Sequence, residues 1–385
     1  MNHAPDPVLA AARWQPASRP GLLPRQAIRS LVERGCLRAA VPLDDAQFQP
    51  ASLDLRLGAY AYRVRASFLP GARSRVEDKL EALQWERIDL SGGAIFERGC
   101  VYVVELSERL DLPAHVSAAA NPKSSTGRLD VFTRLITDRS EAFDAVEPGY
   151  SGPLYAEVSP RTFSIKVRQG TRLNQIRFRQ HGRGADEAGT LGDQALRELH
   201  ARSPLVDADE LAVRNGLVLR IELGGLGPQN LVGYRAQRHT DVIDVERIGG
   251  YRPEDFWEPI PARPDARLIL DPNEFYILAS KERLHIPPHL AAEMVPIDPA
   301  MGEFRVHYAG FFDPGFGYAP SGHPGSRAVM EVRSHEVPFN LEDGQMVCRL
   351  AYEQMAEEPD ALYGAIGTSN YQGQALKLSK QFIQP

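Results

Sequence analysis

Short runs of apolar residues, separated by polar ones, follow one another along most of the chain. In the first half, after Arg87, such runs occupy positions 95–96, 100–106, 116–119, 131–136, 154–158, 164–167 and 173–178. Pro, Gly and Asp separate most of these runs, and their lengths are typical of β-strands. Many short strands with little helix predict an antiparallel β-barrel or jelly roll.

Three earlier segments have other patterns. Residues 24–34 carry apolar side chains at helical spacing, with a proline at the start, which predicts a short amphipathic helix. Residues 51–58 alternate with a period of two and end at Gly58, which predicts a strand closed by a turn. Residues 66–86 are charged, and their pattern is irregular.

The second half of the chain repeats the first at a fixed spacing. Residues 108–115 (ERLDLPAH) match residues 282–289 (ERLHIPPH) at an offset of 174 positions. The same offset relates four further pairs, namely Tyr102 and Tyr276, Ala118 and Ala292, Glu157-Val158 and Glu331-Val332, and Gly170 and Gly344. An offset that persists over roughly 70 residues indicates two tandem copies of one mainly β fold.

The repeat divides the chain into four parts. Residues 1–22 are predicted to be a disordered N-terminal tail. Residues 23–180 form the first copy, and residues 217–385 form the second. Between the copies, residues 181–216 break the strand rhythm and are interpreted as a linker, with a short helix over 193–202.

Composition and charge limit the kinds of partner. Of 385 residues, 43% are hydrophobic and 24% are charged, as in ordinary globular proteins, and the net charge is −6. This balance provides no basic field for nucleic acid or anionic membranes, so a local cluster must hold any polyanionic ligand. The three cysteines lie far apart, and the sequence shows neither a signal peptide nor a membrane-spanning run of ~18 apolar residues. We expect a cytoplasmic protein with no nucleic-acid and no membrane partner.

Residues 123–128 (KSSTGR), here called the serine block, combine hydroxyl and cationic side chains. Ser124 and Ser125, followed by a glycine, let side chains and backbone N–H groups converge on phosphate oxygens. Lys123 and Arg128 would neutralise the phosphate charge. A polar turn between strands would show the same pattern, and the motif alone favours the turn by roughly two to one.

Glu157 is the second candidate residue, because it is a single carboxylate in a predicted strand. Strict alternation in 154–158 (LYAEV) places Tyr155 and Glu157 on one face of that strand. On this pattern alone, a glutamate that faces solvent is the simpler interpretation.

The second copy has lost the serine block. The matching segment is approximately Pro299-Ala300-Met301-Gly302-Glu303, which has no serine and carries Glu303 near the position of Arg128. A carboxylate there would repel phosphate. We therefore expect one site per chain, centred on Glu157 and the serine block of the first copy.

Three enzyme classes lack their signatures in this sequence. No H-x-E and no C-x-x-C occurs, which excludes a zinc-dependent nucleobase deaminase. The G-x-x-x-x-G-K-[ST] pattern of P-loop enzymes is absent. The G-x-S-x-G nucleophile elbow is also absent.

Taken in order, the motifs resemble those of the dCTP deaminases, which belong to the dUTPase-like superfamily. The resemblance rests on 52–58 (SLDLRLG), the serine block, 147–157 (EPGYSGPLYAE) and a tail with Tyr363 and 371–374 (YQGQ). It covers most of 23–180 and then 360–376, and the two-copy layout is similar to a long form found in some bacteria. The second copy keeps Asp313-Pro314-Gly315-Phe316, which is similar to the turn motif of the family.

The resemblance implies a tandem dUTPase-like β fold and hydrolysis of dCTP to dUTP and ammonia, which would feed dUMP and dTTP synthesis. Glu157 would be the general base for water that attacks cytosine C4, without zinc or another catalytic metal. Ser124 and Arg128 would order the water, and Mg²⁺ would be carried by the triphosphate. The implied substrate-binding residues are Lys123, Ser124, Ser125, Arg128, Glu147, Tyr155, Ala156, Tyr363 and Gln374.

The chain departs from the family pattern at three of its positions. Lys123 stands in place of an arginine, which keeps the charge but loses the planar fork. Glu147 stands in place of an aspartate. Asn370 stands where the family tail usually has a phosphate-binding lysine, so another residue would have to supply that cation.

Two other functions fit the same scaffold. One is dUTP pyrophosphatase activity, alone or combined with deamination in a bifunctional enzyme. The other is a non-catalytic nucleotide-binding sensor. The resemblance further implies a homotrimer, because the sites of the family lie between subunits of a threefold, and it implies dTTP as a feedback inhibitor.

Overall fold

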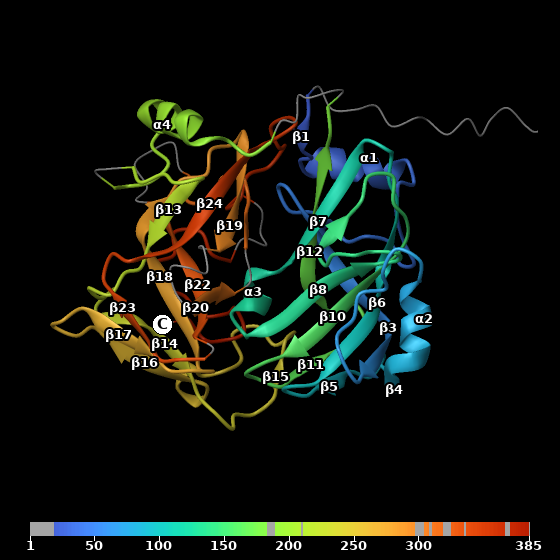
Figure 1. Ribbon diagram of the computed structural model, residues 1–385, viewed down its shortest axis with the longest axis horizontal. Coiled ribbons are helices and arrows are strands. Elements are labelled where there is room, and N and C mark those ends of the chain that lie inside the picture. Colours follow the sequence, from blue (N-terminus) through green and yellow to red (C-terminus); the bar gives the residue numbers. More distant parts are fainter. Residues whose placement is uncertain are drawn as a thin grey trace, which may run out of the picture.

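The computed structural model describes residues 19–182, 189–208, 211–296, 304–307, 310–318, 325–334, 336–365 and 370–384. Figure 1 shows two β-rich lobes, one built from the first half of the chain and one from the second. Most of the predicted N-terminal tail lies outside the described residues. Its last two residues are ordered, because Gly21–Leu22 form β1 and pair with the end of the first copy.

The first lobe, here the N-terminal copy, is almost entirely β-structure. Its main sheet has the strand order β8-β10-β6-β3-β12-β7-β9, and β1, β2 and β4 pair at its sides. Its strands are β1 (Gly21–Leu22), β2 (Leu37–Ala39), β3 (Leu53–Val64), β4 (Gln84–Asp89), β5 (Ala94–Phe96), β6 (Val101–Asp111), β7 (Val116–Pro122), β8 (Val131–Thr137), β9 (Ala145–Val146), β10 (Ser151–Pro160), β11 (Ile165–Val167) and β12 (Arg172–Gln180).

The second lobe, here the C-terminal copy, repeats this topology. Its sheets have the orders β16-β14-β18-β22-β20 and β13-β24-β19-β21, so β13 and β14 together take the place of β3. Its strands are β13 (Leu217–Arg220), β14 (Leu231–Ala236), β15 (Ile243–Asp244), β16 (Trp257–Pro261), β17 (Arg267–Leu270), β18 (Phe275–Leu284), β19 (Leu290–Pro296), β20 (Phe304–His307), β21 (Phe311–Phe312), β22 (Ser326–Ser334), β23 (Phe339–Glu342) and β24 (Met346–Gln354). The prediction of two tandem copies of one mainly β fold is confirmed.

Helices are short and lie outside the sheets. The α-helices are α1 (Arg25–Glu33), α2 (Val76–Leu83), α3 (Ser124–Gly127) and α4 (Asp193–Arg202), and the 3₁₀ helices are η2 (Asp45–Gln47) and η3 (Pro253–Asp255). The predicted first helix corresponds to α1, and α4 lies in the predicted linker. The irregular pattern of 66–86 concealed α2, because this helix fully buries only Val76 and Leu80.

The predicted end of the first strand at Gly58 is wrong, because β3 continues to Val64. A Cβ at Gly58 would lie 2.4 Å from the carbonyl oxygen of Glu105 on β6. The register between β3 and β6 also shifts between Leu57 and Ala61. The glycine therefore permits two strands to approach each other closely at an irregularity of the sheet. In the sequence, a glycine in this role looks the same as one that marks a turn.

Conserved spacing between the copies has a structural cause in hydrogen bonds that both copies make. The Tyr102 hydroxyl accepts a bond of 3.0 Å from the backbone N–H of Glu97, and the Tyr276 hydroxyl accepts one of 3.0 Å from Asp271. Each tyrosine is buried at the start of the central strand of its copy. The equal offset thus preserves, in each copy, the hydrogen bond that closes the equivalent loop.

The matching Glu-Arg-Leu segments preserve a buried ion pair. Glu108 accepts from Arg56 Nε at 2.8 Å and from the backbone N–H of the same arginine at 2.9 Å. Glu282 does the same for Arg220, at 2.6 Å and 2.9 Å. Removing either glutamate would leave buried donors without acceptors, which explains why both copies retain it.

The two copies pack against each other through a shared apolar core. Trp257, Phe275 and Phe382, all from the second half of the chain, belong to the same buried cluster as Phe163 of the N-terminal copy. The ring of Phe163 lies 5.3 Å from that of Trp257 in an edge-to-face arrangement. β15 adds a parallel pairing with β11, so the lobes form one continuous structure.

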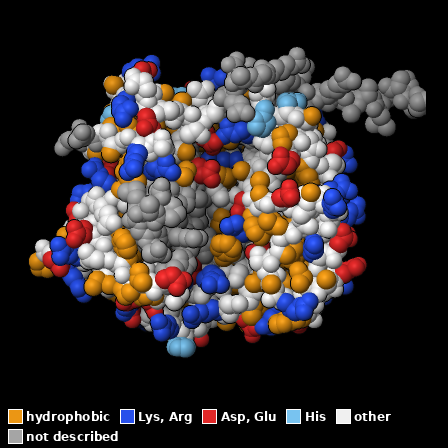
Figure 2. All heavy atoms as spheres, viewed as in Figure 1, with side chains coloured by type: hydrophobic (Ala, Val, Ile, Leu, Met, Phe, Trp, Pro, Cys, Tyr) orange, Lys and Arg blue, Asp and Glu red, His pale blue; other side chains and the backbone are white. Residues whose placement is uncertain are grey.

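Both signs of charge are mixed on the molecular face shown in Figure 2, and no large patch of one sign covers it. Among the described residues, no helix has the length and apolar character needed to cross a bilayer.

Candidate active site

The serine block follows β7 directly, and α3 forms its middle. The backbone N–H of Lys123 and the hydroxyl of Thr126 both donate to the carbonyl oxygen of Leu173 on β12, at 2.9 Å and 2.7 Å. The first N–H groups of a helix have no acceptor within the helix, so those of Ser124 and Ser125 are available to an anion. The local fold therefore presents hydroxyls and amides together.

Lys123 is held by a buried carboxylate. Its ammonium contacts Oδ2 of Asp54, which lies on β3 and has only 1% of its surface exposed. This ion pair orients the lysine at the mouth of the pocket described below. Asp54 comes from the SLDLRLG motif, so two sequence motifs meet here.

Arg128, at the end of the serine block, is buried against the C-terminal tail (residues 360–384). Its Nη2 donates to Oε1 of Gln374 at 3.1 Å, and its Nη1 donates to the backbone carbonyl of Lys377 at 2.7 Å. Its guanidinium also stacks on the ring of Tyr371 at 3.9 Å from the centroid. These contacts bring the tail of the chain onto the first copy.

The tail also binds the second copy, so it joins the two lobes at this point. Gln374 donates through Nε2 to the carbonyl of Arg327 on β22 at 3.0 Å. The Ser379 hydroxyl donates to the carbonyl of Ser125 at 2.7 Å. The Tyr363 hydroxyl accepts from the backbone N–H of Tyr371 at 3.1 Å, which fixes the loop between them.

Glu331, on β22 of the C-terminal copy, lies beside Arg128 of the N-terminal copy. The distance from Arg128 Nε to Glu331 Oε1 is 4.0 Å, and both side chains are buried. Burial raises the pKa of Glu331 to about 8, with Arg128 opposing the rise and Asp130 adding to it. In the described part of the chain, Arg128 Nε has no hydrogen-bond partner. A carboxyl with a pKa near neutrality thus faces a fixed cation.

A second contact between the copies sets the position of Glu331. Two residues further along β22, Arg333 contacts Oδ2 of Asp130 and donates to the Thr162 hydroxyl at 2.9 Å. Asp130 follows the serine block by two residues and has a left-handed backbone, with φ of 54°. The buried ion pair therefore ties β22 directly to the segment that carries Arg128.

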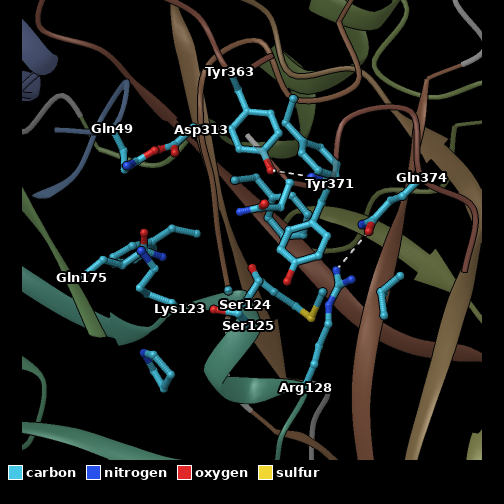
Figure 3. A pocket seen from close by; sticks show the side chains of 18 of the residues that line it. Gln49, Lys123, Ser124, Ser125, Arg128, Gln175, Asp313, Tyr363, Tyr371 and Gln374 are labelled. Atoms are coloured by element: carbon cyan, nitrogen blue, oxygen red, sulfur yellow. Dashed lines mark hydrogen bonds between the residues drawn. The ribbon is translucent and has the colours of Figure 1, made fainter. Parts of the chain in front are cut away.

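A pocket lies between the two copies and the tail. Figure 3 shows the serine block, Tyr363, Tyr371 and Gln374 around it. The lining residues are Gln49, Asp54, Pro122, Lys123, Ser124, Ser125, Arg128, Gln175, Met294, Gly310, Phe311, Phe312, Asp313, Phe316, Val329, Glu331, Tyr363, Asn370, Tyr371 and Gln374.

Asp313 is, after Glu331, the second buried carboxyl that the C-terminal copy supplies to this pocket. It accepts from Nη2 of Arg177 at 3.2 Å, and burial raises its pKa while Arg177 opposes the rise. It belongs to the Asp-Pro-Gly-Phe turn, in which Gly315 has a φ of 94°. A Cβ at Gly315 would approach the backbone N of Tyr363 to 2.9 Å, so the turn and the tail pack closely.

The structure brings together six of the residues that the sequence proposed for the site. Lys123, Ser124, Ser125, Arg128, Tyr363 and Gln374 all line the pocket. The other proposed residues, Glu147, Tyr155, Ala156 and Glu157, do not line it. Glu147 is exposed, and Ala156 is part of the core of the N-terminal copy.

The expectation that Glu157 and the serine block share one site is therefore corrected. Glu157 lies on β10 near the hydroxyl of Ser67 and the backbone N–H of Phe68, and its Oε2 has no hydrogen-bond partner among the described residues. Burial raises the pKa of Glu157, with these two groups and Arg134 opposing the rise. Nor does it face solvent, because only 1% of its surface is exposed. The segment over 66–83, which includes α2, covers the strand face that carries Glu157. The alternation had suggested that this face is exposed to solvent.

The sequence did contain a signal for the residue that was missed. The offset of 174 relates Glu157 to Glu331, and it relates Tyr155 to Val329, which lines the pocket. The Asp-Pro-Gly-Phe turn was also visible as a counterpart of the segment at Glu147. The segment 299–303, which matches the serine block, lies outside the described residues. The packing between the two copies decides which glutamate lies beside the serine block. The sequence offset carries no information about that packing.

No group of three or more His, Cys, Asp or Glu side chains arranged to hold a metal ion occurs among the described residues. The pocket instead offers hydroxyls, backbone amides, two basic side chains and three buried carboxyls. This set suits an anionic, polar organic ligand.

Comparison with known proteins gives consistent matches over both halves of the chain. A family model described as the 2'-deoxycytidine 5'-triphosphate deaminase (DCD) N-terminal domain matches residues 19–183. A second model, for the C-terminal domain of the same family, matches residues 192–382. A crystal structure of 2'-deoxycytidine 5'-triphosphate deaminase from Agrobacterium tumefaciens is 56% identical, with a TM-score of 0.83. It covers 87% of this chain and 99% of that one.

Smaller relatives match part of the chain. The "dCTP deaminase, dUMP-forming" of Beutenbergia cavernae is 30% identical over 164 residues, which is 40% of this chain and 82% of the relative. The "dCTP deaminase" of Haloarcula marismortui is 30% identical over 168 residues, which is 40% of this chain and 83% of the relative. Together with the matched domains and the composite pocket, these similarities show that the chain belongs to the dCTP deaminase family of hydrolytic deaminases.

Proposed function

We propose that this enzyme deaminates dCTP to dUTP and ammonia in the pocket between its two copies, with Glu331 as the general base. The observation that carries the proposal is the buried Glu331 carboxyl at 4.0 Å from Arg128, in a pocket that also holds the serine block. Acid–base chemistry and anion binding require these groups in one place.

In this mechanism, Glu331 takes a proton from water as the water oxygen bonds to cytosine C4. That proton passes to ring nitrogen N3, and the second water proton passes through Glu331 to the departing amino group. The C4–N bond then breaks, so uracil and ammonia result. A carboxyl whose pKa is raised to about 8 by burial can both accept and return a proton near neutral pH.

Arg128 and Ser124 would order the attacking water, as the family resemblance implies. Arg128 is well placed for this role because its Nε is buried and without a hydrogen-bond partner among the described residues, although its other nitrogens are engaged. Its fixed positive charge would also favour the ionised form of Glu331 that starts the reaction.

Base recognition, which the sequence placed at Tyr155-Ala156, is assigned to the corresponding segment Val329-Met330. Val329 lines the pocket next to Glu331 on β22. Tyr363 and Gln374 would close over the nucleotide from the tail. In these assignments, the strand that recognises the base is β22 of the C-terminal copy instead of β10 of the N-terminal copy.

Lys123, Ser124 and Ser125 would bind the phosphates. We retain Mg²⁺ as a proposal, carried by the triphosphate, where it would neutralise phosphate charge. The ion usually takes one or two carboxylates together with phosphates and water. Asp54, beside Lys123, is the carboxylate at this end of the pocket. Inhibition by dTTP likewise stays a prediction.

One chain supplies every residue named in this mechanism. The serine block comes from the N-terminal copy, Glu331 from the C-terminal copy, and Tyr363 and Gln374 from the tail. The proposed mechanism therefore needs no residue from a second subunit. A homotrimer is still a proposal, but the site does not depend on it.

Two matched substitutions test the proposal. Glu331→Gln should abolish ammonia release from dCTP and retain nucleotide binding, because the amide keeps the shape but cannot accept the proton. Glu157→Gln, at the matching position of the other copy, should retain most of the activity. Ammonia release at the wild-type rate by Glu331→Gln, or its loss only in Glu157→Gln, would refute the assignment.

Cleavage of dUTP to dUMP is a second candidate function, because relatives such as that of Beutenbergia cavernae are named dUMP-forming. The second buried carboxyl, Asp313, gives the pocket a further acid–base group for such a step. Measuring ammonia and pyrophosphate from dCTP, and pyrophosphate from dUTP, distinguishes the two. Release of ammonia without pyrophosphate would exclude dUMP formation.

A further inference from the structure

A second pocket adjoins the site at its phosphate-binding end. It shares the lining residues Asp54, Lys123, Ser125 and Asn370 with the first pocket, so the two pockets are adjacent. Its other lining residues are Ala46, Thr126, Leu129, Val131, Gly170, Arg172, Leu173, Val245, Glu246, Ile248, Lys380 and Gln381. A ligand bound at the serine block can therefore extend into this space.

Lys380 differs from the other charged residues of this second pocket. Lys123 contacts Asp54, Arg172 binds Asp44 at 2.9 Å, and Glu246 accepts from the Thr171 hydroxyl at 2.7 Å. In the described part of the chain, no carboxylate lies within ion-pair distance of the Lys380 ammonium, and that ammonium donates no hydrogen bond.

The Lys380 side chain is half-buried, so its charge is only partly hydrated. Burial, and next the nearby charge of Lys123, lower its pKa, while Asp54 and Glu246 partly offset this. Two ammonium groups that face one cavity repel each other unless an anion lies between them. The arrangement thus favours a ligand with more than one negative charge.

Another tail lysine is arranged differently. The Lys377 ammonium donates to the backbone carbonyl of Asn370 at 2.7 Å, and Lys377 lines neither the first nor the second pocket. Asn370 lines both pockets but carries no charge. Lys380 is therefore the tail lysine that lines the second pocket, next to the serine block.

We propose that Lys380 binds the terminal phosphate of the nucleoside triphosphate and that the second pocket holds the end of the phosphate chain. This rests on the proposed function and deepens it, because Lys380 then supplies the tail cation that Asn370 cannot. Lys123 and Lys380 bind successive phosphates from opposite sides. The enzyme consequently selects triphosphates over monophosphates by charge at this end of the site.

Binding measurements on three variants test the proposal. Lys380→Met keeps the length of the side chain and removes its charge, whereas Lys380→Arg keeps the charge. The dissociation constants of dCTP, dCMP and inorganic tripolyphosphate would be measured by calorimetry with Mg²⁺ on the full chain. Lys380→Met should weaken dCTP and tripolyphosphate binding about 10- to 100-fold, the size of one charge-assisted hydrogen bond.

The same variant should leave dCMP binding within about twofold of wild type, and Lys380→Arg should restore most of the dCTP affinity. Lys377→Met serves as the comparison, with the same loss of charge three residues earlier, and should change dCTP binding less than Lys380→Met. Equal dCTP affinity in Lys380→Met and wild type would overturn the inference alone. An equal loss in Lys377→Met would also overturn it. Failure of the wild type to bind any of the three ligands would overturn the proposed function as well.

Discussion

Glu331→Gln should stabilise the unliganded enzyme at neutral and alkaline pH while it abolishes activity. In the folded chain, burial raises the pKa of Glu331 from 4.5 to about 8. The folded state therefore binds one more proton than the unfolded state between these two pH values. The free energy of unfolding then falls as pH rises through this window, because ionising the buried carboxyl is unfavourable.

The size of this effect follows from the pKa. Each pKa unit corresponds to about 1.36 kcal/mol. Relative to a carboxyl that stays protonated, the ionisable Glu331 therefore lowers the free energy of unfolding by about 1 kcal/mol at pH 5.5 and about 5 kcal/mol at pH 8.5. Glutamine is uncharged and similar in shape, so it removes this dependence. Arg128 keeps its bonds to Gln374 and to the carbonyl of Lys377 in the variant.

Thermal unfolding at the two pH values measures the difference. The gain in Tm of Glu331→Gln over wild type should be larger at pH 8.5 than at pH 5.5 by about 4 to 5 °C, because the two pH values differ by about 3 to 4 kcal/mol and a chain of 385 residues shifts by roughly 1.2 °C per kcal/mol. The exposed residue Glu147 provides the control, because Glu147→Gln should shift Tm by little at either pH. A pH-independent gain, or none, would show that Glu331 ionises in the folded state without a penalty and would refute the reasoning.

Two further predictions concern the pH profile and the contact between copies. The rate of dCTP deamination should rise from pH 6 to about 8 and then level off. The reason is that the ionised form of Glu331 is the proposed base and that burial raises its pKa. A rate independent of pH across this range would argue against that role. Arg333→Met should cost about 3–5 kcal/mol in chemical denaturation, because it leaves Asp130 buried without its guanidinium. The matched change Arg267→Met breaks an exposed pair with Glu342 at 3.2 Å and should cost less than about 1 kcal/mol, so equal effects would contradict the argument.

The composite site explains why the two copies have diverged in complementary ways. The N-terminal copy supplies the serine block, and the C-terminal copy supplies Glu331 and Asp313. Glu157, the counterpart of Glu331, is instead covered by the segment that contains α2 and lies near Ser67 and Phe68. The pocket thus takes its serine block from one copy and Glu331 and Asp313 from the other.

The repeated fold could be predicted from the sequence because the contacts that define it lie within each copy. Tyr102 and Tyr276 close equivalent loops, and Glu108 and Glu282 hold equivalent arginines, so each copy must keep the same residues at the same spacing. The alternation of apolar residues likewise reports burial on one strand face, which is a local property. The local signal misled at Gly58, where a glycine serves close strand packing, over 66–86, where an irregular pattern concealed α2, and at Glu157, which is buried.

The serine block and the tail residues could also be proposed from the sequence, because hydroxyls, cations and a glycine in one short segment have a direct chemical meaning. The choice between Glu157 and Glu331 could not. Both lie in similar strands, both are buried, and the sequence around each is compatible with catalysis. Their difference arises from packing between the copies, where Arg333 binds Asp130 and places β22 beside Arg128.

The sequence by itself therefore determined the two β copies and the chemical inventory of the site, because both depend on residues close together in the chain. Only the tertiary structure decided which glutamate meets the serine block and where the tail cation lies. Those pairings join residues more than 200 positions apart, such as Arg128 with Glu331 and Ser125 with Ser379. Their physical basis is the burial of one copy against the other, which no local pattern in the chain records.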